Sequence, residues 1–498
     1  MSERPSAAGA AAWPRRAAAL AAGALCVGAF APLEFLPAAL AALAVLAHLW
    51  SGGRGAREDF LVGWWFGAGL FGAGVSWVFV SLNQFGGLAA PFAAFATLAF
   101  CAFLALFPAA AGGLQAMVPA GPVARVLLVI PALWTATEWV RGSILTGFPW
   151  LAVGSAAPGW PLAGLAPLGG MYACSLALAV AAGLAWCIVR RHALVPSVVA
   201  LTILVAGGEM LRRVEWTSPA GTLGVALLQG NIPQEMKFRP DRYTKTLETY
   251  IGMVEQARSP LVVMPETAIP RFLDLVDPVH LARLEGAARR NGGDLLLGIP
   301  VRTAPDTYLN SVVTLGASPS QRYDKSHLVP WGEFVPPGFR WVMRQMSIPL
   351  SDFTRGSEQP APLRVAGAKV AVSVCYENAF GEEVARQLPE ATLLVNVSNV
   401  AWFGDSLAPA QHLQIARLRA VETGRSHLTA TNTGITAAIE RDGSVAARLP
   451  QFQPGMIERS VALYTGATPY VRVGDLGALL AAALMIGIAV LAPLRSRR

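Results

Sequence analysis

The chain is organised around Lys369-Val-Ala-Val-Ser-Val-Cys-Tyr-Glu377. The β-branched alternation that ends at Val374 predicts a buried strand, and residues 380–388 predict a helix. Cys375 is therefore expected on a strand-to-helix turn, where the N–H groups and positive dipole end of the helix favour a thiolate. Such a position suits a nucleophile. A single cysteine more often serves as a small buried hydrophobe, so this stretch alone leaves both roles open.

Two distant ionisable residues favour the nucleophile. Glu266, in Leu261-Val-Val-Met-Pro-Glu-Thr267, and Lys325, in Arg322-Tyr-Asp-Lys-Ser-His327, each lie at or just past a strand-like run. Both can project from the same sheet edge as Cys375, although either one alone would be ordinary solvated surface. In the order Glu, Lys, Cys, the three resemble the triad of the nitrilase superfamily. That resemblance implies that Glu266 is the general base, that Lys325 stabilises the oxyanion and that Cys375 attacks a carbonyl or nitrile carbon.

The composition indicates a membrane protein without a nucleic-acid partner. Hydrophobic residues make up 54% of the 498 residues and charged residues 14%, which is too apolar for a soluble enzyme of this length. The net charge is +8, yet only four of the 39 basic residues are lysine, and no basic run is interleaved with aromatic residues. Four of the five cysteines lie in apolar segments, which leaves Cys375 without a disulfide partner in the polar part of the chain. The spacing of histidine and cysteine predicts no metal site, and no cofactor is expected.

Apolar segments predict about eight membrane spans. They cover residues 17–33, 35–50, 60–80, 88–110, 124–140, 167–189, 193–208 and 474–494. With a cytoplasmic N-terminus, the inside segments hold Arg4, Arg15, Arg16, Arg54, Arg57, Arg125, Arg190, Arg191, Arg495, Arg497 and Arg498. The outside loops between spans hold Arg141 alone, an asymmetry that follows the positive-inside rule. We therefore expect both termini in the cytoplasm and the large polar block outside it.

The predicted organisation has three parts. Residues 1–208 form a transmembrane bundle of about seven spans, 209–473 form the catalytic domain, and 474–498 form a last transmembrane helix with a basic tail. From residue 222 onward, strand-like and helix-like runs alternate, which indicates an α/β sheet. Strands are expected at 222–229, 261–264, 294–299, 309–315, 369–374, 392–397, 428–431 and 434–440, and helices at 239–256, 278–290 and 409–423. The nitrilase resemblance implies two such sheets stacked in an α-β-β-α sandwich.

Two features of the apolar half favour structural roles. Gly67-Ala-Gly-Leu-Phe-Gly72 matches a dinucleotide-binding fingerprint by its letters, but no strand precedes it within its apolar span. Small residues such as Gly63 and Gly67 are instead expected to let helices pack closely. Glu138 and Arg141 stand at helical spacing, and they either cap a helix or line a polar site at the bilayer surface; we favour the cap for Glu138.

Further stretches resemble the bacterial apolipoprotein N-acyltransferases over essentially the whole chain. They are Gln229-Gly-Asn-Ile-Pro-Gln234, Pro265-Glu-Thr-Ala-Ile-Pro270, Tyr323-Asp-Lys-Ser-His-Leu-Val-Pro-Trp-Gly-Glu-Phe-Val-Pro336, Cys375-Tyr-Glu377, Ala401-Trp-Phe-Gly-Asp405, Gln411-His412 and Arg141-Gly142 with Gly147-Phe-Pro-Trp150. The resemblance implies transfer of a fatty acyl group from a phospholipid, usually phosphatidylethanolamine, through a Cys375 thioester to the α-amino group of diacylglyceryl-modified cysteine in apolipoproteins. It also implies the bacterial inner membrane, with the catalytic domain in the periplasm.

Four more residues are candidates for the site. Glu333 and Glu377 are expected to orient Lys325 or to bind the incoming amine, so Glu333 is grouped with the catalytic residues and Glu377 with the substrate-binding ones. Either could equally be a surface carboxylate. Tyr376 is a substrate-binding candidate beside the nucleophile, and so is Phe238, which stands where the family commonly has tryptophan.

The segment 334–351 predicts an entrance for lipid. It is too polar and too often interrupted by proline to span a bilayer, yet too apolar for an ordinary exposed loop. We expect a portal at the bilayer surface lined by this segment, including Trp341, and by Trp402 and Phe403. Packing of these side chains on the bundle or on the domain core is the alternative.

Two other classes of function compete with acyl transfer. The same triad could hydrolyse an amide or nitrile with water as the second nucleophile, which would make the chain a membrane-tethered amidohydrolase. A transport or lipoprotein-binding protein could instead use the fold as a platform. Such a protein would carry a polar pathway through its spans, and the spans contain few charges.

Overall fold

The computed structural model describes residues 12–335 and 352–495, and the chain forms two compact units. The first unit comprises the described residues up to Phe79, Pro91–Val214 and the chain from Val473 onward. The second comprises Val80–Ala90 and Glu215–Arg472. The sequence had assigned Val80–Ala90 to the transmembrane bundle, but the contacts of these residues group them with the second unit.

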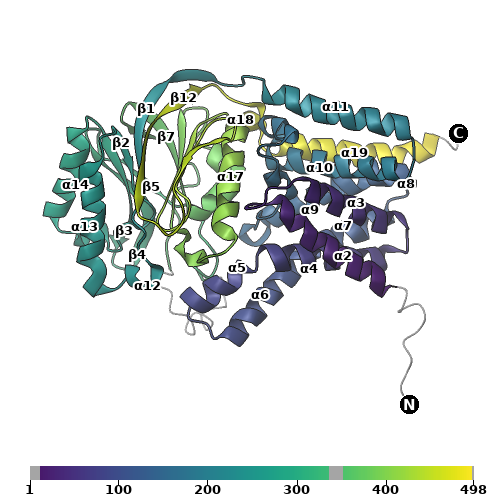
Figure 1. Cartoon of the computed structure of the whole chain (residues 1–498), viewed down its shortest axis with the longest axis horizontal. Coiled ribbons are helices and arrows are strands. Elements are labelled where there is room, and N and C mark those ends of the chain that lie inside the picture. Colours follow the sequence, from purple (N-terminus) through teal and green to yellow (C-terminus); the bar gives the residue numbers. More distant parts are fainter. Residues whose placement is uncertain (1–11, 336–351, 496–498) are drawn as a thin grey trace, which may run out of the picture. The chain divides into compact units, whose positions relative to one another are not determined.

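The first unit is helical (Figure 1). Its main helices are α2 (Trp13–Cys26), α3 (Pro37–Ser51), α4 (Ala56–Gly74), α6 (Ala90–Leu104), α7 (Leu106–Met117), α9 (Ile130–Ser143), α10 (Ala166–Val189), α11 (Leu194–Arg212) and α19 (Leu476–Arg495). Among the described residues, four helical stretches are long and apolar enough to cross a membrane: Ala90–Met117, Pro122–Thr146, Pro161–Val189 and Leu194–Arg212. A fifth is possible if Ala56–Gly74 and the helix Trp77–Phe85, bent away from it, form one broken span.

The predicted count of eight spans is not confirmed. The second expected span corresponds to α3, an apolar helix of 15 residues. At a rise of about 1.5 Å per residue, this helix is shorter than the roughly 30 Å hydrocarbon layer. The eighth expected span corresponds to α19, which has 20 residues. The first expected span contains α2, which has 14 residues and gives way to a 3₁₀ turn at Val27–Ala29. Apolar composition predicted the places of these helices, but not where each helix breaks.

Glycines set the close packing within the first unit. A Cβ atom on Gly63 would collide with the main-chain oxygen of Pro108 in α7, and one on Gly69 would collide with the main-chain oxygen of Leu20 in α2. Only glycine permits such an approach between helices, as the sequence analysis expected for Gly63. Gly72, on the same helix α4, has open space around its Cα.

Glu138 and Arg141 hold a loop within the first unit. Glu138 accepts a hydrogen bond from the main-chain N–H of Val153 at 2.9 Å. Arg141 donates to the main-chain oxygens of Phe148 and Trp150. Both side chains are buried, so these bonds tie the end of α9 to the loop that follows it. This structural role agrees with the one that the sequence favoured for Glu138.

The second unit contains two six-stranded sheets. The first has the strand order β12 (Gly455–Thr465), β1 (Ser218–Gln229), β2 (Leu261–Val263), β3 (Asp294–Ala304), β4 (Thr307–Gly316) and β5 (Arg322–Asp324). The second has the order β11 (Val445–Arg448), β10 (Ala437–Ile439), β9 (His427–Thr431), β8 (Leu393–Ser398), β7 (Ala368–Val374) and β6 (Leu363–Val365). The central pairs β1–β2, β2–β3, β7–β8 and β8–β9 are parallel.

The two sheets stack face to face, with helices on both outer faces (Figure 1). Their shared core includes Val225 and Leu296 from one sheet and Val372 and Leu428 from the other, all of them buried. Each such side chain contributes roughly 1.5–3 kcal/mol by leaving water. The outer face of the first sheet packs on α13 (Pro240–Gln256) and α14 (Pro278–Arg290).

A third long helix covers the second sheet. Leu413, Ala416 and Ala420 of α17 (Ala408–Thr423) pack against β10 of that sheet. The unit is therefore the α-β-β-α sandwich that the resemblance implied. Parallel strands buried on both faces explain why their sequences are almost continuously apolar.

Candidate active site

Cys375 lies at the end of a buried strand in a strained conformation. β7 ends at Val374, and Cys375 has a φ of 53°, a left-handed value that is uncommon for a residue with a side chain. Its main-chain oxygen accepts hydrogen bonds from Asn396 Nδ2 at 3.3 Å and from His412 Nε2 at 3.2 Å. Because a carbonyl only accepts, Nε2 carries the proton of His412, and burial lowers the pKa of this imidazole so that it stays neutral. Two side chains thus hold the sharp turn at the thiol.

Glu266 follows β2 and is cradled by two amides. Its Oε1 atom accepts from Asn310 Nδ2 at 2.7 Å, and its Oε2 atom accepts from the main-chain N–H of Asn399, also at 2.7 Å. The Lys325 ammonium lies 3.8 Å from Oε1. The Glu266 side chain is buried, so these contacts fix both oxygens of the carboxylate.

Lys325 follows β5 and is held by a second carboxylate. Its Nζ atom lies 2.7 Å from Glu333 Oε2 and 2.9 Å from Glu333 Oε1. Burial alone would lower the pKa of the ammonium, but the charges of Glu333 and Glu266 outweigh it and raise the pKa of Lys325. Lys325 is therefore a permanent cation. Glu333 also accepts from the Val329 N–H and from Asn310.

The thiol of Cys375 is not poised as a free thiolate. Loss of water around the sulfur, followed by the charge of Glu266, raises its pKa, while Lys325 acts in the opposite direction. The sequence analysis expected the reverse, on the basis of a helix beginning at the turn. That expectation is wrong because Cys375 opens only a five-residue 3₁₀ helix, and the next α-helix is limited to Gly381–Ala385. The Cys375 thiol therefore needs a base to remove its proton. Glu266 is the candidate, because its charge acts on this thiol.

Glu377 is buried and braces the lysine loop. Its Oε1 atom accepts from the N–H and hydroxyl of Ser326 and from the N–H of His327, and its Oε2 atom accepts from the Tyr323 hydroxyl and the Val374 N–H. Burial raises the pKa of this carboxyl, and these donors counteract that shift. Glu377 is thus not a surface carboxylate. Its contacts favour positioning of the loop beside Lys325 over the predicted substrate binding.

The remaining predicted substrate-binding residues fall into two groups. Tyr376 is half-buried, and its ring lies edge-on to His327 and Phe380. Phe238 and Phe403 are half-buried too. Nothing in the contacts of these three residues identifies a ligand.

Trp402 has partners from a distant part of the chain. Its main-chain oxygen accepts from the Ser81 hydroxyl at 2.8 Å, and its ring lies 6.3 Å from that of Phe85. These partners belong to the π-helical turn Ser81–Phe85 within the second unit. Trp341 lies outside the described residues.

Three residues of the site were missed by sequence reasoning. Asn310 bridges Glu266 and Glu333 through its amide nitrogen. Asn399 binds Glu266 through its main chain, and its side chain donates to Gln234 at 2.9 Å. Lys237 is buried and donates to the main-chain oxygen of Glu266 at 3.2 Å. Asn310 and Asn399 lie within or just beyond expected strands, a position that could have drawn attention to them.

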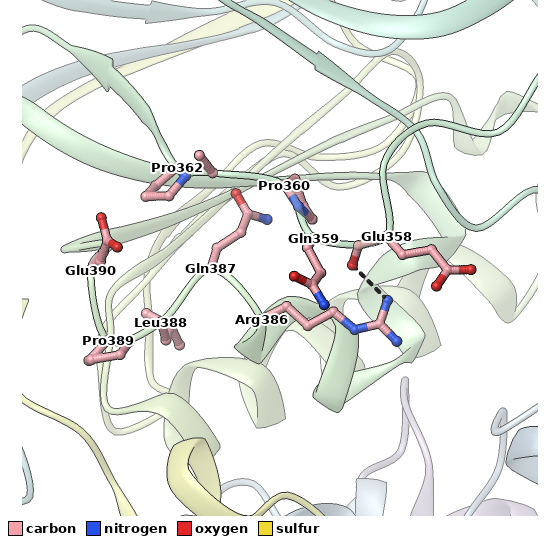
Figure 2. Close-up of a pocket in the computed structure, with 10 residues that line it drawn as sticks. Glu358, Gln359, Pro360, Pro362, Arg386, Gln387, Leu388, Pro389 and Glu390 are labelled. Carbon is pink, nitrogen blue, oxygen red and sulfur yellow. Dashed lines mark hydrogen bonds between the residues drawn. The ribbon is translucent and has the colours of Figure 1, made fainter.

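A surface cavity of the second unit lies apart from these residues. It has a volume of about 440 Å³ and is lined by residues 358–362 and 386–390 (Figure 2). The Arg386 guanidinium donates to the main-chain oxygen of Glu358, and Gln387 bonds to both main-chain groups of Val372. No triad residue lines this cavity. In the part of the chain that the structure describes, no group of three or more His, Cys, Asp or Glu is arranged to hold a metal ion.

Comparison with known proteins agrees with this architecture. A family model described as the apolipoprotein N-acyltransferase N-terminal domain matches residues 22–184, and a carbon-nitrogen hydrolase model matches residues 224–470. Together with the apolar helices, these matches define a membrane protein that carries a carbon-nitrogen hydrolase unit.

Full-length relatives narrow this class. An apolipoprotein N-acyltransferase from Nitrosomonas europaea is 44% identical over 93% of this chain and 94% of its own length. Relatives of the same name from Methylococcus capsulatus and Bordetella bronchiseptica are 44% identical over 94% of both chains and 40% identical over 98% of both chains. The chain belongs to the apolipoprotein N-acyltransferase family, and it is an enzyme.

Proposed function

We propose that this enzyme transfers a fatty acyl group from a membrane phospholipid to the N-terminal α-amino group of diacylglyceryl-modified cysteine in apolipoproteins. The observation that carries the proposal is the cluster of Glu266, Lys325 and Cys375 in a chain that also holds membrane-length apolar helices. Phosphatidylethanolamine is the proposed acyl donor. The relatives support the lipoprotein acceptor through their name.

In the first half-reaction, Glu266 removes the proton of the Cys375 thiol. The sulfur attacks the carbonyl carbon of the phospholipid ester, and the Lys325 ammonium stabilises the oxyanion that develops. When the tetrahedral intermediate collapses, the ester C–O bond breaks. The leaving alkoxide takes the proton from Glu266, so that a lysophospholipid departs and a thioester remains on Cys375.

In the second half-reaction, the amine of the lipoprotein attacks the thioester carbon. Glu266 accepts a proton from the attacking nitrogen, and Lys325 again faces the oxyanion. The C–S bond breaks, an amide forms, and the departing sulfur recovers a proton from Glu266. Because the donor leaves before the acceptor reacts, the cycle is ping-pong.

We place the enzyme in the bacterial inner membrane, with the catalytic unit in the periplasm and both termini in the cytoplasm. The distribution of arginine between the expected spans supports this orientation. Trp402 and Phe403 are proposed to line a portal at the bilayer surface. The contact of Trp402 with Phe85 supports it, because Phe85 ends the helix that starts with the apolar run Trp77–Val80.

One experiment separates acyl transfer from hydrolysis. Purified enzyme is incubated with phospholipid and a diacylated lipopeptide, and the masses of enzyme and peptide are followed. Acyl transfer predicts an enzyme heavier by one acyl group, which disappears as the peptide gains that group. An amidohydrolase would release free fatty acid or ammonia at the same rate without the peptide, and the peptide mass would stay constant.

A further inference from the structure

A second buried lysine lies in the active site. Of the four lysines in the chain, Lys325 and Lys237 are 1% and 2% exposed. Lysine is almost never fully buried unless its charge is matched, so the position of Lys237 requires an explanation. Lys325 has the carboxylates of Glu333 and Glu266 as partners. Among the described residues, Lys237 has one hydrogen-bond partner, the main-chain oxygen of Glu266.

The segment that carries Lys237 is fixed by side chains of the second sheet. It forms the short helix α12 (Gln234–Lys237) directly after β1. Asn399 donates to Gln234 Oε1 at 2.9 Å, and the N–H of the same Asn399 donates to Glu266. Asn432 exchanges hydrogen bonds with both main-chain groups of Ile232. Hydrogen bonds from Asn399 and Asn432 therefore fix the segment that carries the Lys237 ammonium.

The charges around Cys375 show what the second ammonium contributes. Three buried or nearly buried carboxylates, Glu266, Glu333 and Glu377, surround the site, and His412 is a further titratable group at the Cys375 turn. Burial keeps the imidazole of His412 neutral by lowering its pKa. With Lys325 as the single cation, the site would carry two net negative charges before the thiol gave up its proton. A second cation, the ammonium of Lys237, reduces the net charge of the site to one negative charge.

We propose that Lys237 is a positioning residue of the active site, a second buried ammonium that anchors the main chain of Glu266 and lowers the electrostatic cost of forming the Cys375 thiolate. The proposal deepens the function given above and rests on it, because it concerns the same nucleophile. Desolvation lowers the pKa of Lys237 to about 8, while Glu266 and Cys375 act to raise it. Lys237 therefore carries its charge at neutral pH and sits in the field of both reacting groups.

The test measures the reactivity of Cys375 without any lipid or lipoprotein. Iodoacetamide alkylation of the full-length protein is followed by intact mass across pH 6–10, because the rate reports the thiolate fraction. The other four cysteines are buried in the first unit, so Cys375 reacts first. We compare the wild type with Lys237→Met, which keeps the length of the side chain, and with Lys237→Arg, which keeps the charge. Lys245→Met, on the exposed face of α13, is the matched control.

Loss of the ammonium should raise the apparent pKa of the thiol by about one unit, which makes alkylation about tenfold slower near pH 7, where Lys237 is charged. The difference should shrink above pH 8, because Lys237 of the wild type then loses its own proton. Lys237→Arg should stay closer to the wild type, and Lys245→Met should match it. Superimposable pH profiles for Lys237→Met and the wild type would overturn the proposal. Equal shifts in the Met and Arg variants would overturn it too, since they would show that shape matters and charge does not. If Lys237→Met does not fold, Lys237→Gln is measured against the same criteria.

The readout also separates this inference from the proposed function. Alkylation depends only on the thiol and its surroundings. If Lys237→Met is alkylated more slowly, as predicted, but the wild type transfers no acyl group from phospholipid, the proposed donor is refuted and the role of Lys237 stands. If the wild type transfers the acyl group but Lys237→Met is alkylated at the wild-type rate, only the role of Lys237 is refuted.

Discussion

Replacing Glu266 with glutamine should slow formation of the acyl-enzyme by about 10²–10⁴-fold, the usual contribution of a general base. At about 1.36 kcal/mol for each factor of ten, this is a barrier increase of ~2.7–5.4 kcal/mol. The structure explains why the loss cannot be bypassed at neutral pH. Burial is the largest cause of the raised pKa of the Cys375 thiol and persists when the charge of Glu266 is removed, so few molecules hold a thiolate without the base. Burst-phase intact mass after mixing with phospholipid measures the step directly.

The pH dependence of the same variant has a definite sign. Below the pKa of the thiol, each unit of pH increases the thiolate fraction about tenfold. The residual rate of Glu266→Gln should therefore rise with pH at a slope near one on a logarithmic plot, whereas the wild type should respond less. Acylation of Glu266→Gln at the wild-type rate near pH 7 would refute the assignment of the base.

The structure also predicts a loss of stability that is separate from catalysis. The carboxylate of Glu266 accepts from Asn310 on one oxygen and from Asn399 on the other. If the NH₂ group of glutamine faces Asn399, the main-chain N–H of that residue loses its acceptor. If it faces Asn310, the amide of Asn310 loses one of its two acceptors and keeps Glu333. One unsatisfied buried donor costs about 1–3 kcal/mol, so the thermal unfolding temperature of the second unit should fall. Activity should be compared at temperatures where both proteins are folded.

Three shorter predictions concern the nucleophile, the helix packing and the topology. Cys375→Ser should retain the fold, shown by an unchanged melting curve, and form no acyl adduct detectable by mass, because a hydroxyl provides far too little anion. Gly69→Leu should reduce the yield of folded protein in size-exclusion chromatography by forcing α2 and α4 apart, and Gly72→Leu should not, since space is open there; equal yields would contradict the packing. A reporter fused after Arg191 should score cytoplasmic and one fused after Ala220 periplasmic; the reverse result would overturn the compartment.

Much of the sandwich could be predicted from local pattern. Runs such as that of β8 (Leu393–Ser398) are apolar and bounded by polar residues, so period and length identify them as buried strands. β12 was missed. Its exposed and buried residues mix irregularly, and its partner β1 lies more than 200 residues away in the sequence. Pairing at that separation leaves no local signal.

The triad was predictable and its support was not. Glu266 and Lys325 follow β2 and β5 of the first sheet, and Cys375 follows β7 of the second. The expectation of one shared sheet edge was therefore wrong, because the three residues come from two stacked sheets. Asn399 reaches Glu266 through a main-chain N–H, a group that every residue except proline possesses. Its identity therefore carries no information about that contact. The expected thiolate form of Cys375 depended on a helix over residues 380–388. That helix covers only the five residues Gly381–Ala385, and the boundaries of elements are the least predictable feature of a sequence.

The division of labour among the three carboxylates follows from how many donors each one has. Glu377 accepts five hydrogen bonds, and Glu333 accepts from Val329, from Asn310 and twice from Lys325.

These contacts commit Glu377 to the loop that carries Lys325 and commit Glu333 to the Lys325 ammonium. Glu266 has two amide donors, with the Lys325 ammonium farther away at 3.8 Å. Of the three, it accepts the fewest hydrogen bonds. Glu333 keeps Lys325 charged for the oxyanion, Glu377 fixes the loop that carries Lys325, and Glu266 is left to exchange the proton with Cys375.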